Sequence, residues 1–196
     1  MATYHGITAV GQAILSILGE ACPKPEFAGA EFKLYHATSF KTPITQGVSL
    51  FLYRVTVNAN VRNLQPRLGN DGLYYRPSLP LDLHYLLNVW WPDAAKLQRL
   101  LGWCMRELED MPILSHIVLN HSGPEPGIFE EAETVELTLE ELSLQDLANI
   151  TDAFKGNLQI CVPYVARMVR VDSMILMDEG GVVQTREFGV GKLLTI

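Results

Sequence analysis

Residues 50–87 constrain the fold most, because two strand-like segments flank a polar connection. Residues 49–58 are rich in Phe, Tyr and Val, which favours a strand. Residues 79–91 place an apolar side chain at every second position over most of their length, the period of a strand with one buried face. The connection contains Gly69-Asn70-Asp71-Gly72, a strong turn sequence. Two strands joined in this way most simply pair antiparallel.

Helical spacing appears on both sides of this region. One face of a predicted N-terminal helix holds Ile7, Val10, Ile14, Ile17 and Leu18. No Lys or Arg precedes this segment, so we interpret it as an amphipathic helix rather than a secretion signal. A second helix is predicted to begin after Asp93, a suitable N-cap, and to end at Met111 before Pro112. Ser143 and Asp146 predict the start of a third helix, which runs to about Phe154.

Shorter strand patterns complete the chain at residues 31–37, 133–139 and 158–171. Pro163 within the last of these indicates an edge strand or a bulge. Residues 182–188 return to a strand-like pattern after Gly180-Gly181. We therefore predict the α+β class, with a mainly antiparallel sheet flanked by helices. The expected organisation is a single domain over residues 1–171 and a C-terminal arm over residues 172–196.

The composition favours protein partners. Charged residues make up 19% of the chain, against about 25% in an average soluble protein, which leaves more apolar surface to bury. The net charge of −7 and the absence of a Lys/Arg cluster argue against nucleic acid. No apolar run reaches the roughly 18 residues that span a bilayer, so we expect no direct membrane insertion. Cys22, Cys104 and Cys161 form no CxxC pair and are expected to be reduced thiols of a cytoplasmic protein.

Asp82 and His84 are two residues apart on a predicted strand, so their side chains should share one face. A carboxylate and an imidazole can both bind a metal ion, which keeps a metal-dependent hydrolase open as an alternative. A metal site needs three or four ligands, however, and no further compact His/Asp group supplies them. The favoured interpretation is a polar network in the interior or at a subunit contact.

Arg54 interrupts a strand that is otherwise nearly all apolar, and strict alternation places it on the face opposite Tyr53. A buried guanidinium needs a partner, and Asp82 on the next strand offers a carboxylate. We predict that the Arg54 and Asp82 side chains lie close together. The alternative is that Arg54 extends its charged end into solvent at the sheet edge. Trp90 and Trp91, at a strand end, either anchor the core or belong to a partner surface.

Several blocks of the sequence resemble one known family. They are residues 50–58 with Arg62-Asn63, Arg76-Pro77 with residues 81–87, residues 97–102, 111–114, 142–147 and 161–169. In this order, over about residues 5–171, they resemble the tail terminator (cap) proteins of phage-tail-like contractile injection systems, of the antifeeding-prophage and Photorhabdus virulence cassette type. Residues beyond Asp172 lie outside the resemblance.

The resemblance implies a structural assembly protein rather than an enzyme, with no cofactor. Such proteins form a hexameric ring that caps the distal end of an inner tube and contractile sheath and ends their polymerisation. The implied partners are further copies of the chain and the tube and sheath proteins. The implied location is the cytoplasm during assembly and then the particle itself. Another connector or completion protein of the same particle is the nearest alternative. The expected structural or interface network comprises Arg54, Arg62, Asn63, Arg76, Asp82, His84, Trp90 and Trp91.

Overall fold

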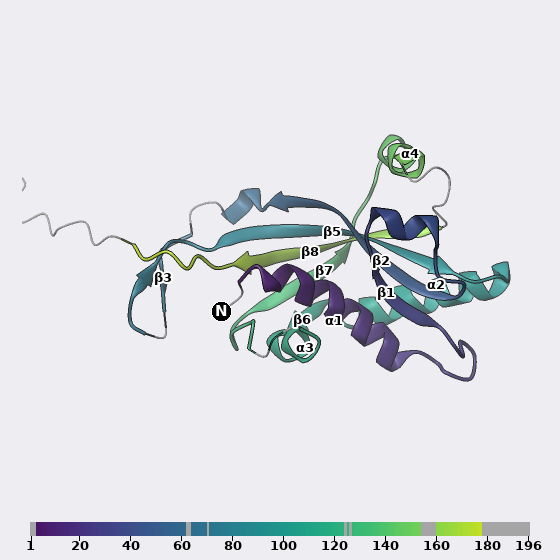
Figure 1. The fold of residues 1–196 in the computed structure, drawn as a ribbon, viewed down its shortest axis with the longest axis horizontal. Coiled ribbons are helices and arrows are strands. Elements are labelled where there is room, and N and C mark those ends of the chain that lie inside the picture. The colour runs from purple at the N-terminus through teal and green to yellow at the C-terminus, as the bar shows by residue number, and fades with distance from the viewer. Residues whose placement is uncertain are drawn as a thin grey trace, which may run out of the picture.

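A six-stranded sheet organises the protein (Figure 1). The structure is a computed structural model that describes residues 3–61, 64–69, 71–123, 125, 127–153 and 160–177. In spatial order the strands are β1 (Glu31–Tyr35), β2 (Gly47–Val57), β5 (Leu79–Trp90), β8 (Cys161–Val171), β7 (Thr134–Leu139) and β6 (Ile113–Ser115). Only the β1–β2 pair is parallel. The predicted α+β class and the antiparallel pairing of β2 with β5 are confirmed.

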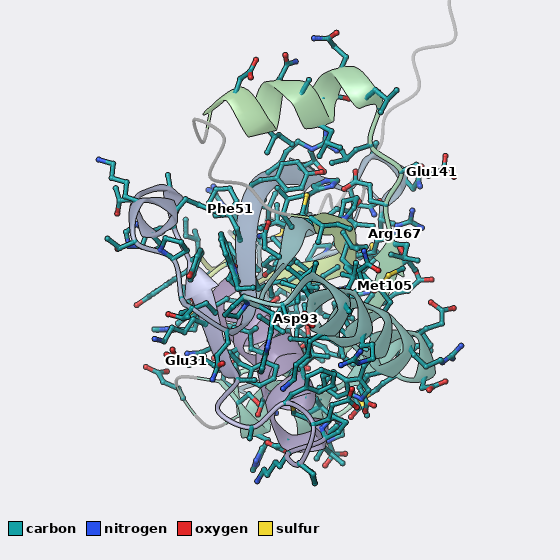
Figure 2. The ribbon with its side chains drawn as sticks, turned by 90° about the vertical axis from the view of Figure 1, so that its right-hand side faces the viewer. Glu31, Phe51, Asp93, Met105, Glu141 and Arg167 are labelled. Carbon is teal, nitrogen blue, oxygen red and sulfur yellow. The ribbon has the colours of Figure 1, made fainter. Side chains whose placement is uncertain are left out.

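Helices flank the sheet on both sides, and those on one side cover it (Figure 1). Figures 1 and 2 place α1 (His5–Ala21), α2 (Ala94–Asp110) and α3 (His116–His121) on one face and α4 (Leu144–Ala153) on the other. The main core lies between the sheet and the first three helices. Its fully buried members include Val10, Ile14 and Leu18 of α1, Leu83 and Leu87 of β5, and Leu100 and Leu108 of α2. Burial of these apolar faces supplies most of the driving force for folding.

Local sequence explains where the helices begin. The Asp93 carboxylate accepts a hydrogen bond from Lys96 N at 2.7 Å, as an N-cap does. At the start of α4, Ser143 Oγ accepts from Asp146 N at 3.1 Å and donates to the Asp146 carboxylate at 2.7 Å. Both predicted helix starts are therefore confirmed. A short 3-10 helix, η1 (Ala37–Lys41), precedes β2, and a second, η2 (Ala59–Val61), follows it.

The register of β2 against β5 shifts between Leu52 and Arg54, so Tyr53 occupies a bulge. An extra residue reverses the alternation that follows it, because side chains in a strand repeat every two residues. The side chains of Tyr53 and Arg54 accordingly lie on one face, where both contact Glu140. The prediction that Arg54 and Tyr53 point to opposite faces is wrong for this reason.

Pro163 has a local explanation in the sheet. Its strand, β8, lies in the interior, between β5 and β7, and is not the edge strand that the proline indicated. However, β7 ends at Leu139 opposite Tyr164, and Glu140 N donates to the Pro163 carbonyl at 3.0 Å. The missing N–H of Pro163 thus falls where the ladder with β7 stops, so no regular strand hydrogen bond is lost.

A slender projection leaves the body of the protein beyond the ends of β5 and β8 (Figure 1). Its hairpin consists of β3 (Arg67–Leu68) and β4 (Tyr74–Tyr75), within a segment predicted to be a loop. Residues 172–177 run beside this hairpin, where Arg76 N donates to Ile175 O at 2.9 Å and Met177 N donates to Tyr74 O at 2.8 Å. We call residues 67–69, 71–76 and 172–177 together the arm. Residues 178–196, including the strand-like residues 182–188, lie outside the described residues.

The cysteines are free thiols, with Cys22 and Cys104 buried and Cys161 half-buried. Burial raises the pKa of the Cys104 thiol, which keeps it protonated. In the described part of the chain, no helix is both long and apolar enough to cross a membrane.

Candidate functional site

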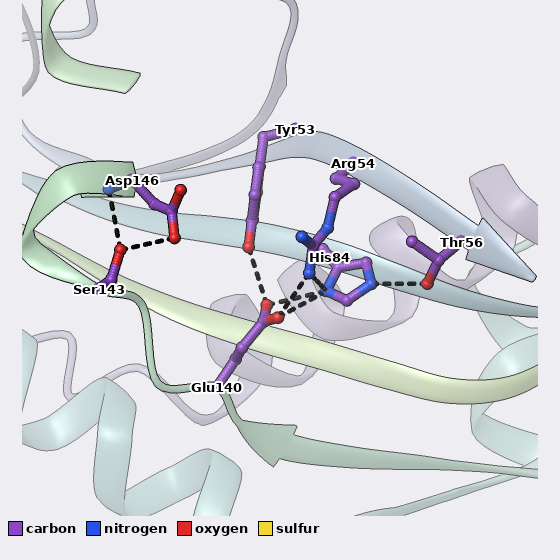
Figure 3. Close-up of polar contacts among 7 residues, drawn as sticks. All are labelled: Tyr53, Arg54, Thr56, His84, Glu140, Ser143 and Asp146. Carbon is purple, nitrogen blue, oxygen red and sulfur yellow. Dashed lines mark hydrogen bonds and ion pairs between the residues drawn. The ribbon is translucent and has the colours of Figure 1, made fainter. Parts of the chain in front are cut away.

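Glu140, the residue directly after β7, holds together side chains from two other strands (Figure 3). Its carboxylate accepts a hydrogen bond from the Tyr53 hydroxyl at 2.8 Å and pairs with Arg54 Nη2 at 2.9 Å. His84 Nδ1 lies 2.8 Å from the same carboxylate. The Glu140 side chain is only 16% exposed, so these contacts replace most of its contact with water. We call Tyr53, Arg54, Thr56, His84 and Glu140 the Glu140 cluster.

His84 links this carboxylate to a hydroxyl. Its Nε2 lies 2.9 Å from Thr56 Oγ1, and its side chain is 9% exposed. The tautomer that satisfies both contacts carries its proton on Nδ1, which donates to Glu140, while Nε2 accepts from Thr56. Burial and the hydrogen bond to Glu140 raise the pKa of Tyr53, so its phenol keeps the proton that it donates.

The order carboxylate, imidazole, hydroxyl is also that of a general-base relay in acyl-transfer enzymes. In those enzymes the carboxylate is free to stabilise an imidazolium and the hydroxyl can reach a substrate. Here the Glu140 charge is shared with Arg54 and with the Tyr53 hydroxyl. Five side chains from β2, β5 and the end of β7 therefore satisfy one another. A fully satisfied network of this kind fixes the relative positions of strands, and this is the role that the contacts favour.

Asp82 belongs to a separate group of contacts. Its carboxylate accepts from Asn58 Nδ2 at 3.0 and 3.1 Å and from Met168 N at 3.1 Å. The β5–β8 register shifts at this position, and Met168 has a φ of +62°. Asp82 thus stabilises a bulge in β8 by binding a backbone N–H that an irregular ladder would leave unpaired.

The predicted pairing of Arg54 with Asp82 is wrong. The bulge at Tyr53 brings Arg54 opposite His84, beside the end of β7, and its guanidinium pairs with Glu140 instead. Within the described residues, no three or more His, Cys, Asp or Glu side chains are grouped so that they could hold a metal ion.

The two tryptophans pack within the body of the protein. Trp90 is 3% exposed, its ring lies at 50° to that of Phe40, and its Nε1 donates to Ser49 Oγ at 2.7 Å. Of the two interpretations left open, packing therefore holds for Trp90. Trp91 is half-buried, and Lys96 Nζ lies 4.4 Å from the centre of its ring.

The predicted network is brought together only in part. Arg54 and His84 meet at Glu140, whereas Arg76 lies exposed in the arm. Arg62 and Asn63 lie outside the described residues. Sequence reasoning missed Glu140 itself, because it precedes Glu141 at a strand end and has the local pattern of a solvated carboxylate. Its separation of 56 residues from His84 leaves no spacing signal that could have found the contact.

Solved structures of two particle components share this fold. The fold is similar to that of the sheath/tube terminator of the extracellular contractile injection system PVC in its extended state. That pair has a TM-score of 0.57 and 14% identity, over 96% of this chain and 64% of that one. It is also similar to the tube-terminating cap of the anti-feeding prophage, with a TM-score of 0.55 and 14% identity, over 92% of this chain and 60% of that one.

Residues 9–185 match the sequence model of the Pvc16 N-terminal domain, and the chain belongs to this family. The family resemblance seen in the sequence is thereby confirmed. The chain spans less than two thirds of the length of either terminator. The search of curated proteins finds no match.

Proposed function

We propose that the protein is a structural component of a phage-tail-like contractile injection system that caps the distal end of the inner tube and sheath. In this role it ends polymerisation as a ring, with six copies as the expected number. The observation that carries the proposal is the family match over residues 9–185, together with a fold shared with two terminators of such particles.

The side-chain contacts support a structural rather than a catalytic role. Glu140 and His84 are occupied by each other and by three further side chains, and Asp82 holds a backbone bulge. The alternative of a metal-dependent hydrolase on Asp82 and His84 would need both side chains released from these partners. The proposed partners are further copies and the tube and sheath proteins, with assembly in the cytoplasm before the particle is complete. No cofactor is part of this proposal.

Particle length tests the proposal. Particles assembled without this protein should have inner tubes and sheaths of widely distributed length, because nothing stops subunit addition at the distal end. Electron microscopy of negatively stained particles measures that distribution, and adding back the full chain should narrow it. A narrow, unchanged length distribution without the protein would refute the proposal.

The chain after β8 is proposed to contribute to attachment. Deleting residues 173–196 should weaken binding to tube or sheath while the body, residues 3–171, still folds on its own core. Co-sedimentation of the deletion variant with assembled tubes measures this. If the deletion variant still caps particles of normal length, the C-terminal segment is not needed for attachment to tube or sheath.

A further inference from the structure

Exposed large apolar side chains gather on the arm. Those exposed by 48–66% are Leu68, Leu73, Tyr74, Met174, Ile175 and Leu176. Each of them exposes about half of its surface or more. A group of exposed apolar side chains on a projection away from the core indicates a binding surface.

A second apolar surface lies where the C-terminal ends of α1 and α2 meet α3. It is a groove of about 500 Å³, lined mainly by Ile17, Met111, Ile117 and Val118. Ile117 is 67% exposed, although it lies on a helix that contacts the core through Leu119. The groove therefore has room for two or three apolar side chains of a partner.

The arm and the groove lie far apart on one chain. Figure 1 shows the arm beyond the N-terminal end of α1, whereas the groove includes Ser16, Glu20 and Ala21 near the C-terminal end of that helix. A 17-residue helix is about 25 Å long. Contact between the two surfaces thus requires a second copy, and a contact between two different surfaces of identical chains is head-to-tail.

We propose that the arm of one copy binds the α1–α2–α3 groove of the next copy. This inference rests on the proposed function, since a head-to-tail contact that closes on itself makes a ring. One set of charges favours it. The arm exposes both Arg76 and Asp71, and of these Arg76 would face the carboxylates of Glu20 and Glu107, which line the groove. Apolar side chains would be buried at the centre of the contact, and the opposite charges would lie at its edge.

Three single substitutions in the full chain test the proposal. Leu176→Asp changes the arm and Ile117→Asp changes the groove. Leu144→Asp is the matched control, because Leu144 is 87% exposed on α4, away from both surfaces. Sedimentation velocity over a concentration series measures assembly, and circular dichroism verifies that each variant is folded. Leu176→Asp and Ile117→Asp should each weaken assembly by at least about 30-fold, because each buries an unpaired carboxylate in an apolar contact. Leu144→Asp should assemble like the unchanged chain.

Mixing the two damaged variants distinguishes a head-to-tail contact from a symmetric one. Leu176→Asp retains its groove and Ile117→Asp retains its arm, so an equimolar mixture should form a one-to-one dimer that grows no further. A mixture that stays monomeric would overturn the pairing of arm with groove. Three other results would also overturn it. The unchanged chain could be monomeric at all concentrations, Leu176→Asp or Ile117→Asp could assemble normally, or Leu144→Asp could weaken assembly as much as they do.

The proposed function can fail independently of this contact. Particles of normal length without the protein would refute capping, while assembly through arm and groove would still be seen in the purified chain. Conversely, a protein that limits particle length but assembles normally with Ile117→Asp would cap through a different contact between copies.

Discussion

Replacing Glu140 with Ala removes the acceptor on which three side chains from two strands converge. The substitution leaves the Tyr53 hydroxyl, 2.8 Å away, and the His84 ring, at 2.8 Å, without their partner. Both groups are largely shielded from water, so they cannot fully replace the lost hydrogen bonds. Arg54 loses an ion pair as well, but its side chain is 50% exposed and can be hydrated.

The magnitude follows from burial. A buried group that loses its partner costs about 1–3 kcal/mol, and an exposed ion pair contributes less than about 1 kcal/mol. Tyr53 and His84 are buried groups that lose a partner, and Arg54 loses an exposed ion pair. Because contributions of neighbouring groups are not additive, the three together predict a loss of about 2–4 kcal/mol in the free energy of unfolding. For a domain of this size that corresponds to a fall of roughly 5–15 °C in Tm.

Urea unfolding followed by circular dichroism measures the effect, with Glu141→Ala as the control. Glu141 is adjacent in sequence and exposed, so its removal should change the free energy of unfolding by less than about 0.5 kcal/mol. Glu140→Gln should lie between the two, because the amide oxygen can still accept from Tyr53 or His84.

A double-mutant cycle with Tyr53→Phe isolates the hydroxyl–carboxylate contact. The two substitutions should be non-additive by at least about 0.5 kcal/mol. If Glu140→Ala costs no more than Glu141→Ala, or if the cycle is additive, the Glu140 cluster does not hold the strands together.

Three further changes test other parts of the fold. Gly47→Ala should cost about 2–4 kcal/mol in urea unfolding, because Gly47 has a φ of +132° and a Cβ there would overlap the Glu31 carbonyl oxygen. A cost below 1 kcal/mol would show that the start of β2 can shift. Asp82→Ala should cost about 1–3 kcal/mol by releasing Asn58 Nδ2 and Met168 N, and Asp82→Asn, which keeps an acceptor oxygen, should cost less. Equal costs would contradict the role of the carboxyl oxygen. Burial raises the pKa of Glu133, so its charged form is disfavoured in the fold. The resulting penalty is absent below the unfolded-state pKa and grows as the pH rises through the folded-state pKa. Glu133→Gln should therefore raise Tm more at pH 8 than at pH 4, and the opposite order in thermal unfolding would refute this.

Much of the fold could be predicted because its determinants are local. Alternation in residues 49–58 and 79–91, helical spacing in residues 7–18, and the cap residues Asp93 and Ser143 act over a few positions. The bulge at Tyr53 could not be predicted in this way. It depends on how two strands match each other, and the residues around it are equally compatible with a regular strand.

The same difference between local and long-range determinants applies to the polar residues of the candidate site. Arg54 and His84 stand out in sequence, because charged and polar side chains are unusual among apolar strand residues. Their common partner, Glu140, looks like a surface carboxylate until β7 is placed beside β8 in the sheet. Asp82, the partner expected because it lies on the next strand, instead accepts a hydrogen bond from Met168 N.

The sequence by itself determined the class of fold, the identity of most elements and the family resemblance, because these depend on periodicity and on ordered blocks of residues. Only the tertiary structure decided which carboxylate neutralises Arg54, where the bulges fall, and that the 60–76 connection joins residues 172–177 in an apolar arm. Those features depend on contacts between residues tens of positions apart. Loop closure can bring many such pairs together at similar entropic cost, and packing of the whole sheet selects among them.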